Sequence, residues 1–521
     1  MNRENSIEFL NQNNTNWDVI IIGGGATGLG IAVDASLRGH KTLLLEQSDF
    51  TKGTSSRSTK LIHGGVRYLT QGNIGLVFEA LHERGLLFKN APHLTQNLSF
   101  IVPSYQTWKG YFYTLGLKIY DVLAGRLSLG NSSYIDAEKV KKHLPNLKTK
   151  HLKNGTIYHD GQFDDARLGI NLAQTSVENG AHVLNYMRVT GLEKNEKGTI
   201  HKVQATDLET GKDYGLNTKA VINATGVFAD NILNMDEQEK KPIILSSQGT
   251  HLVFDSKFFP SDYALMIPKT SDGRVLFAIP WYTKVVVGTT DIIVEKESLE
   301  PKALQKEINF IIDTFNQYLV EPVTRADVLS VFSGLRPLAR PQKEHLKTKE
   351  ISRSHKIIVS KSGLVTIIGG KWTTYRRMAE DTLDYIQKKG ILPKQKCRTS
   401  NFKIHGFSLN QDTKNPLHRY GTDAAKILKL TEENPEWAAQ LHPDYPFIKA
   451  EVIWAVRHEM ARKVEDILAR RLRILFLDAR AAVLMAPETA TLIANERKLP
   501  HSWTIEEIKN FEVLAKGYWL E

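Results

Sequence analysis

The stretch that decides the fold is WDVIIIGGGATGLGIAVDASLRGHKTLLLE, residues 17–46. Its β-branched run at residues 19–22 predicts a strand that is buried on both faces. Residues 26–38 then predict a helix, and residues 41–45 predict a second strand. Strand, glycine-rich turn, helix and strand in this order predict a Rossmann-like α/β unit with a doubly wound sheet.

Three glycines lie between the first strand and the helix, and Gly23, Gly25 and Gly28 fit the pattern G-x-G-x-x-G. The first permits a tight turn, the second lets a pyrophosphate approach the backbone, and the third lets the helix pack closely. The helix N-terminus directs its N–H groups and positive dipole end toward a phosphate. A structural glycine-rich turn without a ligand is the alternative.

Glu46 ends the second strand, at the place where this fold carries a ribose-binding acid. An acid there favours an unphosphorylated ribose, and therefore FAD or NAD over NADP. The pattern does not separate FAD from NAD.

Composition limits the remaining possibilities. A chain of 521 residues has room for about three domains, and 41% hydrophobic and 24% charged residues are typical of a soluble globular protein. Cys397 is the single cysteine, which excludes an internal disulfide and a thiolate-cluster metal site. Redox chemistry would therefore need a bound cofactor, and we expect no metal. Residues 1–16 carry no secretory pattern, so we expect a flexible tail, no membrane-spanning helix and a cytoplasmic protein.

The net charge of +11 favours anionic partners, which include phosphate esters, nucleic acids and acidic lipid surfaces. Charge alone does not choose among these three classes.

A second motif, TSSRSTKLIHGGVRYL at residues 54–69, combines small hydroxyl residues, paired glycines and basic residues. In this motif the chain resembles the FAD-dependent glycerol-3-phosphate dehydrogenases. The resemblance extends in order over nearly the whole chain from about residue 17. It includes YHDGQFDDARL (158–168), VINATG (221–226), QGTHLVF (248–254), SGLRPL (333–338), GGKWTTYR (369–376) and RHEMARKVEDILARRLRILFLD (457–478).

The resemblance implies three domains. A discontinuous FAD-binding domain would comprise residues 17–85, 158–245 and 345–392, and a mixed-sheet α+β substrate-binding domain would comprise residues 86–157 and 246–344. Residues 393–521 would form a linker and a C-terminal helical domain. Apolar residues between 452 and 468 recur at helical spacing, which predicts one amphipathic helix there.

The implied activity is oxidation of sn-glycerol 3-phosphate to dihydroxyacetone phosphate by hydride transfer to noncovalent FAD, with reoxidation by a membrane quinone. The enzyme would then lie on the cytoplasmic face of the inner membrane, and a homodimer is a candidate assembly. One alternative is an oxidase that reduces oxygen to hydrogen peroxide. A more distant alternative is a flavin-containing nucleic-acid binder that uses the basic residues of 457–473. Acidic residues interrupt that segment and no aromatic residue is interleaved, so we expect no nucleic-acid partner.

Oxidation of an alcohol requires a base for the hydroxyl proton, because the flavin accepts only the hydride. We expect His251 to be this base, since a neutral imidazole titrates near the working pH and the resemblance places its strand over the flavin. His63 is the rival, and a merely packed histidine is the structural alternative.

The phosphate of the substrate calls for cations with directed hydrogen bonds. Arg67 and Arg336 lie in glycine-flanked motifs and suit a phosphate dianion, with Tyr68 as an added hydroxyl donor. Ordinary surface charges are the alternative. Lys371 would place positive charge beside the flavin ring. Further cofactor contacts are expected from Thr54, Ser55, Ser56, Thr225, Gly226, Gly369 and Gly370.

Residues 108–127 carry apolar side chains at helical spacing, flanked by basic residues. This pattern suits a helix that lies on an acidic membrane surface. A helix that covers the core of the substrate domain explains the spacing equally well, so both interpretations stay open.

Overall fold

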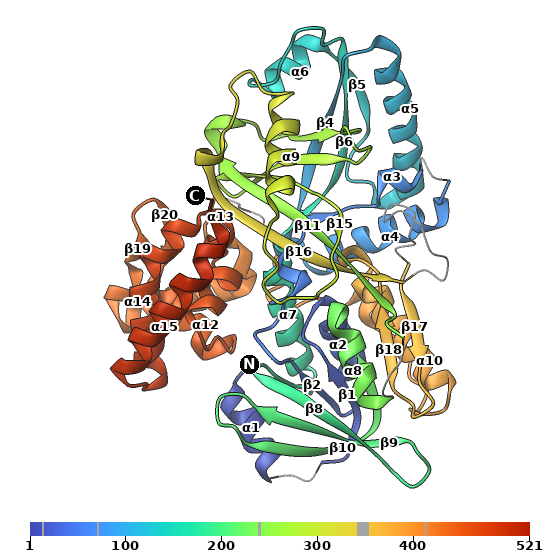
Figure 1. Ribbon diagram of the computed structural model, residues 1–521, viewed down its shortest axis with the longest axis vertical. Helices are drawn as coiled ribbons and strands as arrows, with labels where there is room; N and C mark the ends of the chain where they lie inside the picture. Colours follow the sequence, from blue (N-terminus) through green and yellow to red (C-terminus); the bar gives the residue numbers. More distant parts are fainter. Residues whose placement is uncertain are drawn as a thin grey trace.

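The computed structural model describes residues 1–12, 15–69, 72–237, 241–340, 354–410, 412 and 414–520, without the side chains of Arg67 and Tyr68. Two large sheets lie one after the other along the long axis of the molecule, and the C-terminal helices lie beside the junction of these sheets (Figure 1). This is the predicted α/β architecture with a C-terminal helical domain.

The first sheet is the predicted Rossmann-like unit. Five of its strands run parallel in the order β18-β10-β1-β2-β7, and β17 adds an antiparallel edge. Helices α2, α7 and α10 pack against this sheet and share one apolar core with β1. The elements are β1 (Trp17–Ile22), α2 (Ala26–Leu37), β2 (Thr42–Leu45), α7 (Asp165–Glu178), β7 (His182–Leu184), β8 (Met187–Lys194), β9 (Ile200–Asp207), β10 (Asp213–Asn223), α8 (Ala229–Asp236), β17 (Lys356–Val359), β18 (Val365–Ile368) and α10 (Tyr375–Lys388).

The second sheet has ten strands in the order β15-β11-β14-β13-β12-β4-β6-β3, with β16 beside β11 and β5 beside β6. Strands β4 and β12 run parallel while β11, β14 and β16 pair antiparallel, so the sheet is mixed as expected. Its elements are β3 (Leu61–Ile62), α3 (Val66–Leu69), α4 (Ile74–Asn90), β4 (Thr95–Ser104), α5 (Thr107–Ala124), β5 (Ser133–Asp136), α6 (Ala137–His143), β6 (Asn154–Phe163), β11 (Ile244–Asp255), β12 (Ala264–Ile267), β13 (Leu276–Trp281), β14 (Lys284–Gly288), β15 (Ile292–Ile293), α9 (Gln305–Asn316) and β16 (Val328–Ala339).

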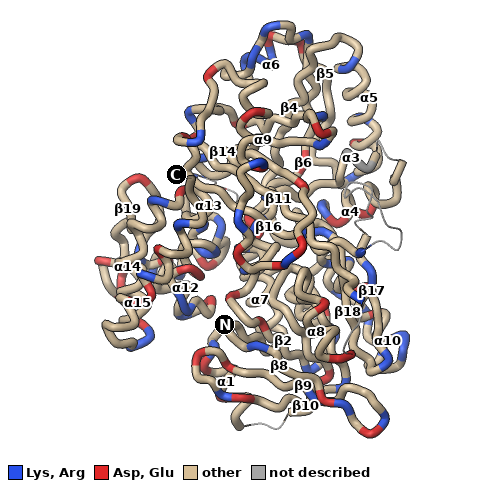
Figure 2. The backbone as a smooth tube through the Cα atoms, in the orientation of Figure 1, with Lys and Arg blue, Asp and Glu red and all other residues tan. Residues whose placement is uncertain are grey.

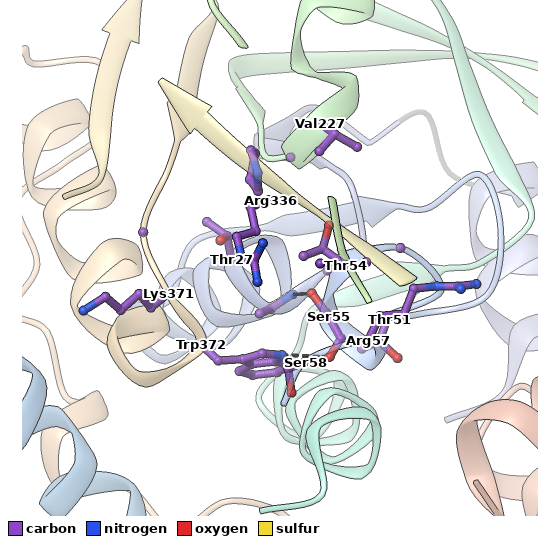
Figure 3. Close-up of a pocket in the computed structure, with 18 of the residues that line it drawn as sticks. Thr27, Thr51, Thr54, Ser55, Arg57, Ser58, Val227, Arg336, Lys371 and Trp372 are labelled. Atoms are coloured by element: carbon purple, nitrogen blue, oxygen red, sulfur yellow. Dashed lines mark hydrogen bonds between the residues drawn. The ribbon is translucent and has the colours of Figure 1, made fainter. Parts of the chain in front are cut away.

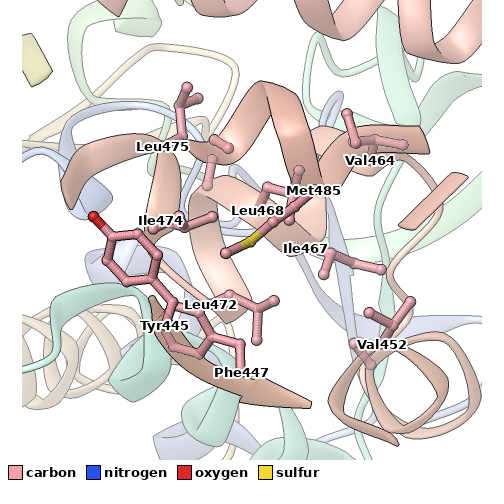
Figure 4. Packing of buried hydrophobic residues seen from close by; sticks show 14 of the residues in the cluster. Tyr445, Phe447, Val452, Val464, Ile467, Leu468, Leu472, Ile474, Leu475 and Met485 are labelled. Atoms are coloured by element: carbon pink, nitrogen blue, oxygen red, sulfur yellow. The ribbon is translucent and has the colours of Figure 1, made fainter. Parts of the chain in front are cut away.

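The C-terminal domain is helical and has its own apolar core, part of which Figure 4 shows. Phe332 of β16 and Trp281 of β13 belong to the same core, so this domain is packed onto the second sheet. Its elements are α11 (Ala424–Glu433), β19 (Gln440–His442), β20 (Tyr445–Ile448), α12 (Lys449–His458), α13 (Ile474–Leu477), α14 (Ala479–Arg497) and α15 (His501–Ala515).

The N-terminal segment differs from the expected flexible tail, because residues Arg3–Gln12 form helix α1. Arg3 is buried and donates to the Asp207 carboxylate at 2.5 Å and to the Asn185 carbonyl at 3.1 Å. Phe9 stacks on His182 at 4.1 Å. These partners lie far along the chain, so composition alone did not reveal them.

The single helix expected between residues 452 and 468 is also wrong. Helix α12 ends at His458, and Met460 adopts a left-handed φ of 54°. The Asp466 carboxylate accepts the backbone N–H groups of Arg462 and Lys463, and a π-helical turn, Asp466–Arg471, follows. The Asp466 side chain thus reaches back to N–H groups that precede it, and a separate helical segment follows the break after α12.

The domain boundaries stay predictions, but strand pairing refines them. Residues 61–62 and 158–163 fell in the expected FAD-binding domain, yet β3 and β6 pair with each other in the second sheet. Strand β6 stays in register with β4 from Asn154 to Phe163, so no break occurs at residue 158. The predicted boundary at residue 345 lies outside the described residues.

The basic residues of 457–473 are mostly interior. The exposed fractions of Arg470, Arg471 and Arg473 are 1%, 0% and 0%, and all three pair with carboxylates. Figure 2 shows basic and acidic positions close together in the C-terminal domain. A nucleic-acid binder needs an exposed basic stripe. Most of the arginines that suggested a nucleic-acid binder are buried, so they no longer support that alternative. In the described part of the chain, no helix is both long and apolar enough to cross a bilayer.

The turn between β1 and α2 gives a stability prediction. A Cβ on Gly28 would lie 1.9 Å from the Gly23 carbonyl oxygen, whereas a Cβ on Gly116 in α5 would meet no atom within 4 Å. We expect Gly28→Ala to lower the thermal unfolding midpoint by about 3 °C or more, since backbone must move. Gly116→Ala, the control, should keep or raise the midpoint because alanine favours a helix. Equal midpoints, measured by circular dichroism, would contradict the packing argument.

Candidate active site

A cavity of about 700 Å³ lies where the carboxyl ends of the parallel strands meet the second sheet. Its walls come from the β1–α2 turn, the end of β2, residues 51–59, the ends of β10 and β18, and strands β11 and β16. Open α/β sheets bind ligands at this edge. The cavity is therefore the candidate active site, and Figure 3 shows part of its lining.

The glycine turn leaves backbone exposed to this cavity. Gly23 has a φ of 108°, and a Cβ there would lie 2.8 Å from the Ala224 carbonyl oxygen. Gly23 and Gly25 line the cavity. Gly28 does not line it and instead lets α2 pack against the turn. The turn expected at Gly23 and the close helix packing expected at Gly28 are thus present in the geometry, and the approach of a pyrophosphate to Gly25 stays a prediction.

Glu46 lines the same end of the cavity. Its two carboxylate oxygens accept the N–H groups of Gly24 at 2.6 Å and Ser48 at 2.9 Å. Burial raises the pKa of Glu46 above its usual value, although these two hydrogen bonds act in the opposite direction. Each oxygen keeps a second lone pair for a ribose hydroxyl.

The loop after β2 supplies hydroxyl groups to the cavity wall. Thr54 and Ser55 line the cavity, and Ser55 is fixed from two sides. Its hydroxyl accepts the Ala26 N–H at 2.9 Å, and its carbonyl accepts the Trp372 indole N–H at 2.8 Å (Figure 3). Ser56 is buried and does not line the cavity, so the structure does not support its expected contact with a cofactor.

Two further strand ends complete this side of the cavity. Thr225 and Gly226 follow β10, and Gly369, Gly370 and Lys371 follow β18; all five line the cavity. In Figure 3 the Lys371 side chain extends away from the group formed by Arg336, Thr27 and Thr54. The expected positive charge beside a flavin therefore stays a prediction.

His251 lies on β11 and lines the cavity although only 2% of it is exposed. Its Nε2 lies 3.0 Å from the Thr59 hydroxyl, and its ring stacks on Phe332 at 4.8 Å. Among the described residues, its Nδ1 has no hydrogen-bond partner. Burial, and then the charges of Lys60 and Arg336, hold the pKa of His251 well below its usual value. The imidazole is therefore neutral near pH 7 and can accept a proton.

Arg336 lies on β16, which pairs with β11. Its guanidinium donates to the Thr290 carbonyl and the Thr289 hydroxyl at 3.3 Å and lies 3.5 Å from the Asp291 carboxylate. A Cβ on Gly249 would approach its Nη2 to 2.4 Å, so the glycine makes room for this cation. The arrangement presents a fixed guanidinium at the cavity wall.

His63 also lines the cavity, so it stays the rival of His251. The side chains of Arg67 and Tyr68 lie outside the described residues, and their predicted roles are not tested. Sequence reasoning missed Thr59 and Trp372, whose contacts are described above. Thr59 lies within the motif at residues 54–69, but nothing near it in the sequence indicates its role, because its partner His251 is 192 positions away.

The backbone at the turn, the acid at the end of β2 and the hydroxyl groups of Thr54 and Ser55 fit the pyrophosphate and ribose of a dinucleotide. The model of the family described as FAD dependent oxidoreductase matches residues 18–376, and that described as the C-terminal domain of alpha-glycerophosphate oxidase matches residues 363–504. Fold and site together define a FAD-dependent oxidoreductase, which settles the choice between FAD and NAD.

Comparison with similar proteins identifies the family within this class of oxidoreductases. A probable mitochondrial glycerol-3-phosphate dehydrogenase of Caenorhabditis elegans is 40% identical over 92% of this chain and 70% of its own length. A mitochondrial glycerol-3-phosphate dehydrogenase of Arabidopsis thaliana is 39% identical over 94% and 85%. The solved glycerol-3-phosphate dehydrogenase of Bacillus halodurans, complexed with FAD, is 28% identical, with a TM-score of 0.80 over 99% of this chain and 97% of that one. The chain belongs to the FAD-dependent glycerol-3-phosphate dehydrogenase family.

Proposed function

We propose that the protein oxidises sn-glycerol 3-phosphate to dihydroxyacetone phosphate. The observation that carries the proposal is the pairing of β11 with β16, which puts a neutral buried histidine and a fixed arginine on the wall of one cavity. FAD, held without a covalent bond, supplies the hydride acceptor when it is bound.

The protein's own residues bind the substrate and move its proton. Arg336 binds the phosphate dianion, because a guanidinium offers paired N–H donors and keeps its charge. The carboxylate of Asp291 and the Thr290 carbonyl hold that guanidinium in place. The His251 ring accepts the C2 hydroxyl proton. His63, Arg67, Tyr68 and Lys371 are proposed to contribute as the resemblance implies.

We also propose that a membrane quinone takes the electrons and that the enzyme binds an acidic membrane surface, as a peripheral protein of the cytoplasmic face. Helix α5 supports this proposal, because it lies at the edge of the molecule away from the C-terminal domain (Figure 1) and carries large exposed apolar side chains. Its inner side is lined by Gly110, Thr114, Leu117, Tyr120 and Ala124. Its exposed residues are Trp108 (63%), Tyr111 (59%), Phe112 (59%), Leu115 (64%), Ile119 (49%) and Val122 (79%). A helix that only covered a core would turn these side chains inward.

An oxidase that reduces oxygen is the second candidate, because the C-terminal match carries the name of alpha-glycerophosphate oxidase. Three measurements test these proposals. Anaerobic mixing of the purified holoenzyme with glycerol 3-phosphate should bleach the flavin absorbance, and unchanged absorbance would overturn the proposal. Stoichiometric hydrogen peroxide during aerobic turnover would select the oxidase. Acid precipitation should leave the flavin in solution.

His251→Asn should slow anaerobic flavin reduction by about 10²–10⁴-fold while FAD stays bound, because a positioned base is lost. In the wild type, the rate should stay high as the pH falls through 6.5 and decline only below it, since the pKa of His251 is lowered. The control is His93→Asn, a buried histidine outside the cavity lining. Stopped-flow measurements decide: near-normal reduction in His251→Asn would move the base to His63 or to water.

Arg336→Lys should raise KM for glycerol 3-phosphate roughly tenfold to a hundredfold. The loss of a paired, charged hydrogen bond costs about 1.5–3 kcal/mol even though the positive charge is kept. Arg325→Lys, at an exposed position, serves as the control. If steady-state kinetics give an unchanged KM and the variant only unfolds more easily, Arg336 has a structural role.

Replacing both Phe112 and Leu115 with serine should weaken binding to vesicles of phosphatidylglycerol and phosphatidylcholine by tenfold or more, since each removes apolar area that a membrane would bury. Leu484→Ser with Val513→Ser is the matched control, because those side chains are 69% and 65% exposed in the C-terminal domain. Co-sedimentation measures the binding. Equal loss in both pairs would argue against α5 as the contact.

A further inference from the structure

The buried carboxylate of Asp165 lies behind the cavity wall, at the start of α7, and collects hydrogen bonds from three directions. It accepts the backbone N–H of Ser58 at 3.1 Å and its hydroxyl at 2.6 Å. It also accepts the Lys60 ammonium at 2.8 Å and the Arg473 guanidinium at 2.8 Å. Asp165, Lys60 and Arg473 all have exposed fractions of 0%.

Arg473 comes from the C-terminal domain, and the geometry around it is specific. It adopts a left-handed φ of 70° just before α13, which is uncommon for a residue with a side chain. One Nη atom reaches both Asp165 and the Ser56 carbonyl, the latter at 2.8 Å. Its guanidinium carbon lies 4.7 Å from the centre of the Phe476 ring. The side chain is therefore fixed by its own domain while it bonds to the FAD-binding domain.

These bonds surround residues 56–60, which we call the hydroxyl loop. The Ser56 carbonyl also accepts Lys60 at 2.7 Å, so the loop is closed on itself around the Asp165 carboxylate. Ser58 and Thr59 of this loop line the cavity. Thr59 meets His251 Nε2 at 3.0 Å. A hydrogen bond at one ring nitrogen fixes the orientation of the imidazole, and the Thr59 hydroxyl can serve there as donor or as acceptor.

We propose that Asp165 and Arg473 are positioning residues, through which the C-terminal domain holds the hydroxyl loop and keeps the Thr59 hydroxyl against His251. The proposal rests on the proposed function, in which His251 is the base. It gives the C-terminal domain a part in building the active site. Neither residue lines the cavity, so both act through Thr59 rather than on the substrate.

Charge balance favours a role in positioning. Burial lowers the pKa of Lys60 to about 7 even though Asp165 raises it, and Arg473 lowers it further. Asp165 is therefore the carboxylate that two buried cations share. Arg473 also lies 3.6 Å from the Asp164 carboxylate, so its removal leaves two carboxylates, Asp164 and Asp165, facing Lys60, and the surrounding backbone must rearrange. The backbone nearest to the cluster is the hydroxyl loop.

The test compares Arg473→Met with Arg419→Met in the holoenzyme. Arg419 is a matched control, because it is 3% exposed, pairs with Glu451 within the C-terminal domain and is not bonded to the hydroxyl loop. Hydrogen–deuterium exchange of a peptide covering residues 54–62 measures the loop directly, without turnover. Stopped-flow flavin reduction at saturating and limiting glycerol 3-phosphate gives the limiting rate and the apparent dissociation constant separately.

In Arg473→Met we expect loop exchange to rise tenfold or more and the limiting reduction rate to fall about tenfold, with FAD retained and the dissociation constant changed less than threefold. Arg473→Lys should recover part of the rate. Arg419→Met should lower the thermal midpoint but leave both readouts unchanged. Wild-type exchange and reduction in Arg473→Met, with only a lower midpoint, would overturn the proposal.

If Arg473→Met does not fold, Ser58→Ala decides, because it removes one donor to Asp165 without touching the C-terminal domain. Its loop exchange should rise at least threefold, and unchanged exchange would overturn the proposal. A wild-type enzyme whose flavin is not bleached by glycerol 3-phosphate would refute the proposed function. The exchange result would still stand as a separate measurement of the loop.

Discussion

The close approach of three chain segments at the carboxyl edge of the parallel sheet is the constraint on which the structure depends. The Gly23 backbone faces the Ala224 carbonyl so closely that a Cβ would lie 2.8 Å from it, and Gly28 faces the Gly23 carbonyl more closely still. Strands β10 and β18 reach this edge only because the chain returns to the first sheet after excursions into the second. The cavity lies where the ends of β10 and β18 meet strands β11 and β16.

The sequence predicted what local periodicity and motif order encode. The β1–α2–β2 unit follows from residues 17–46 and the mixed second sheet from the resemblance, and most of the predicted site residues with described side chains line the cavity. The predictions failed where the deciding partner is distant: Arg3 became part of a helix docked on Asp207, 204 positions away. Hydrophobic spacing across residues 452–468 suggested one helix, but it did not reveal the break after His458, where the Asp466 carboxylate accepts the N–H groups of Arg462 and Lys463. The spacing of apolar residues indicates which face of a helix is buried, whereas the point at which a helix ends depends on particular hydrogen bonds.

The burial of charged side chains was the property that was hardest to predict from the sequence. A net charge of +11 and a cluster of arginines suggest an exposed anion-binding surface. Instead, Arg470 and Arg471 share the buried Asp49 carboxylate, which lies more than 400 positions earlier in the chain. In the sequence, these arginines look like surface charges, because no neighbouring residue indicates the distant carboxylate. The same limit explains why Ser56 was expected at the cofactor and is found behind the wall.

Buried ion pairs at the domain junction have a consequence for specificity. Their attraction roughly offsets the cost of removing both ions from water, so they contribute little net stability compared with apolar packing. A misplaced partner, however, leaves an uncompensated charge and is strongly unfavourable. The pairs of Arg470 with Asp49 and of Arg473 with Asp165 therefore select one seating of the C-terminal domain among many that its apolar core would tolerate. Because Arg473 also donates to the Ser56 carbonyl, the same ion pair connects the placement of the C-terminal domain to residues 56–60, beside the proposed base.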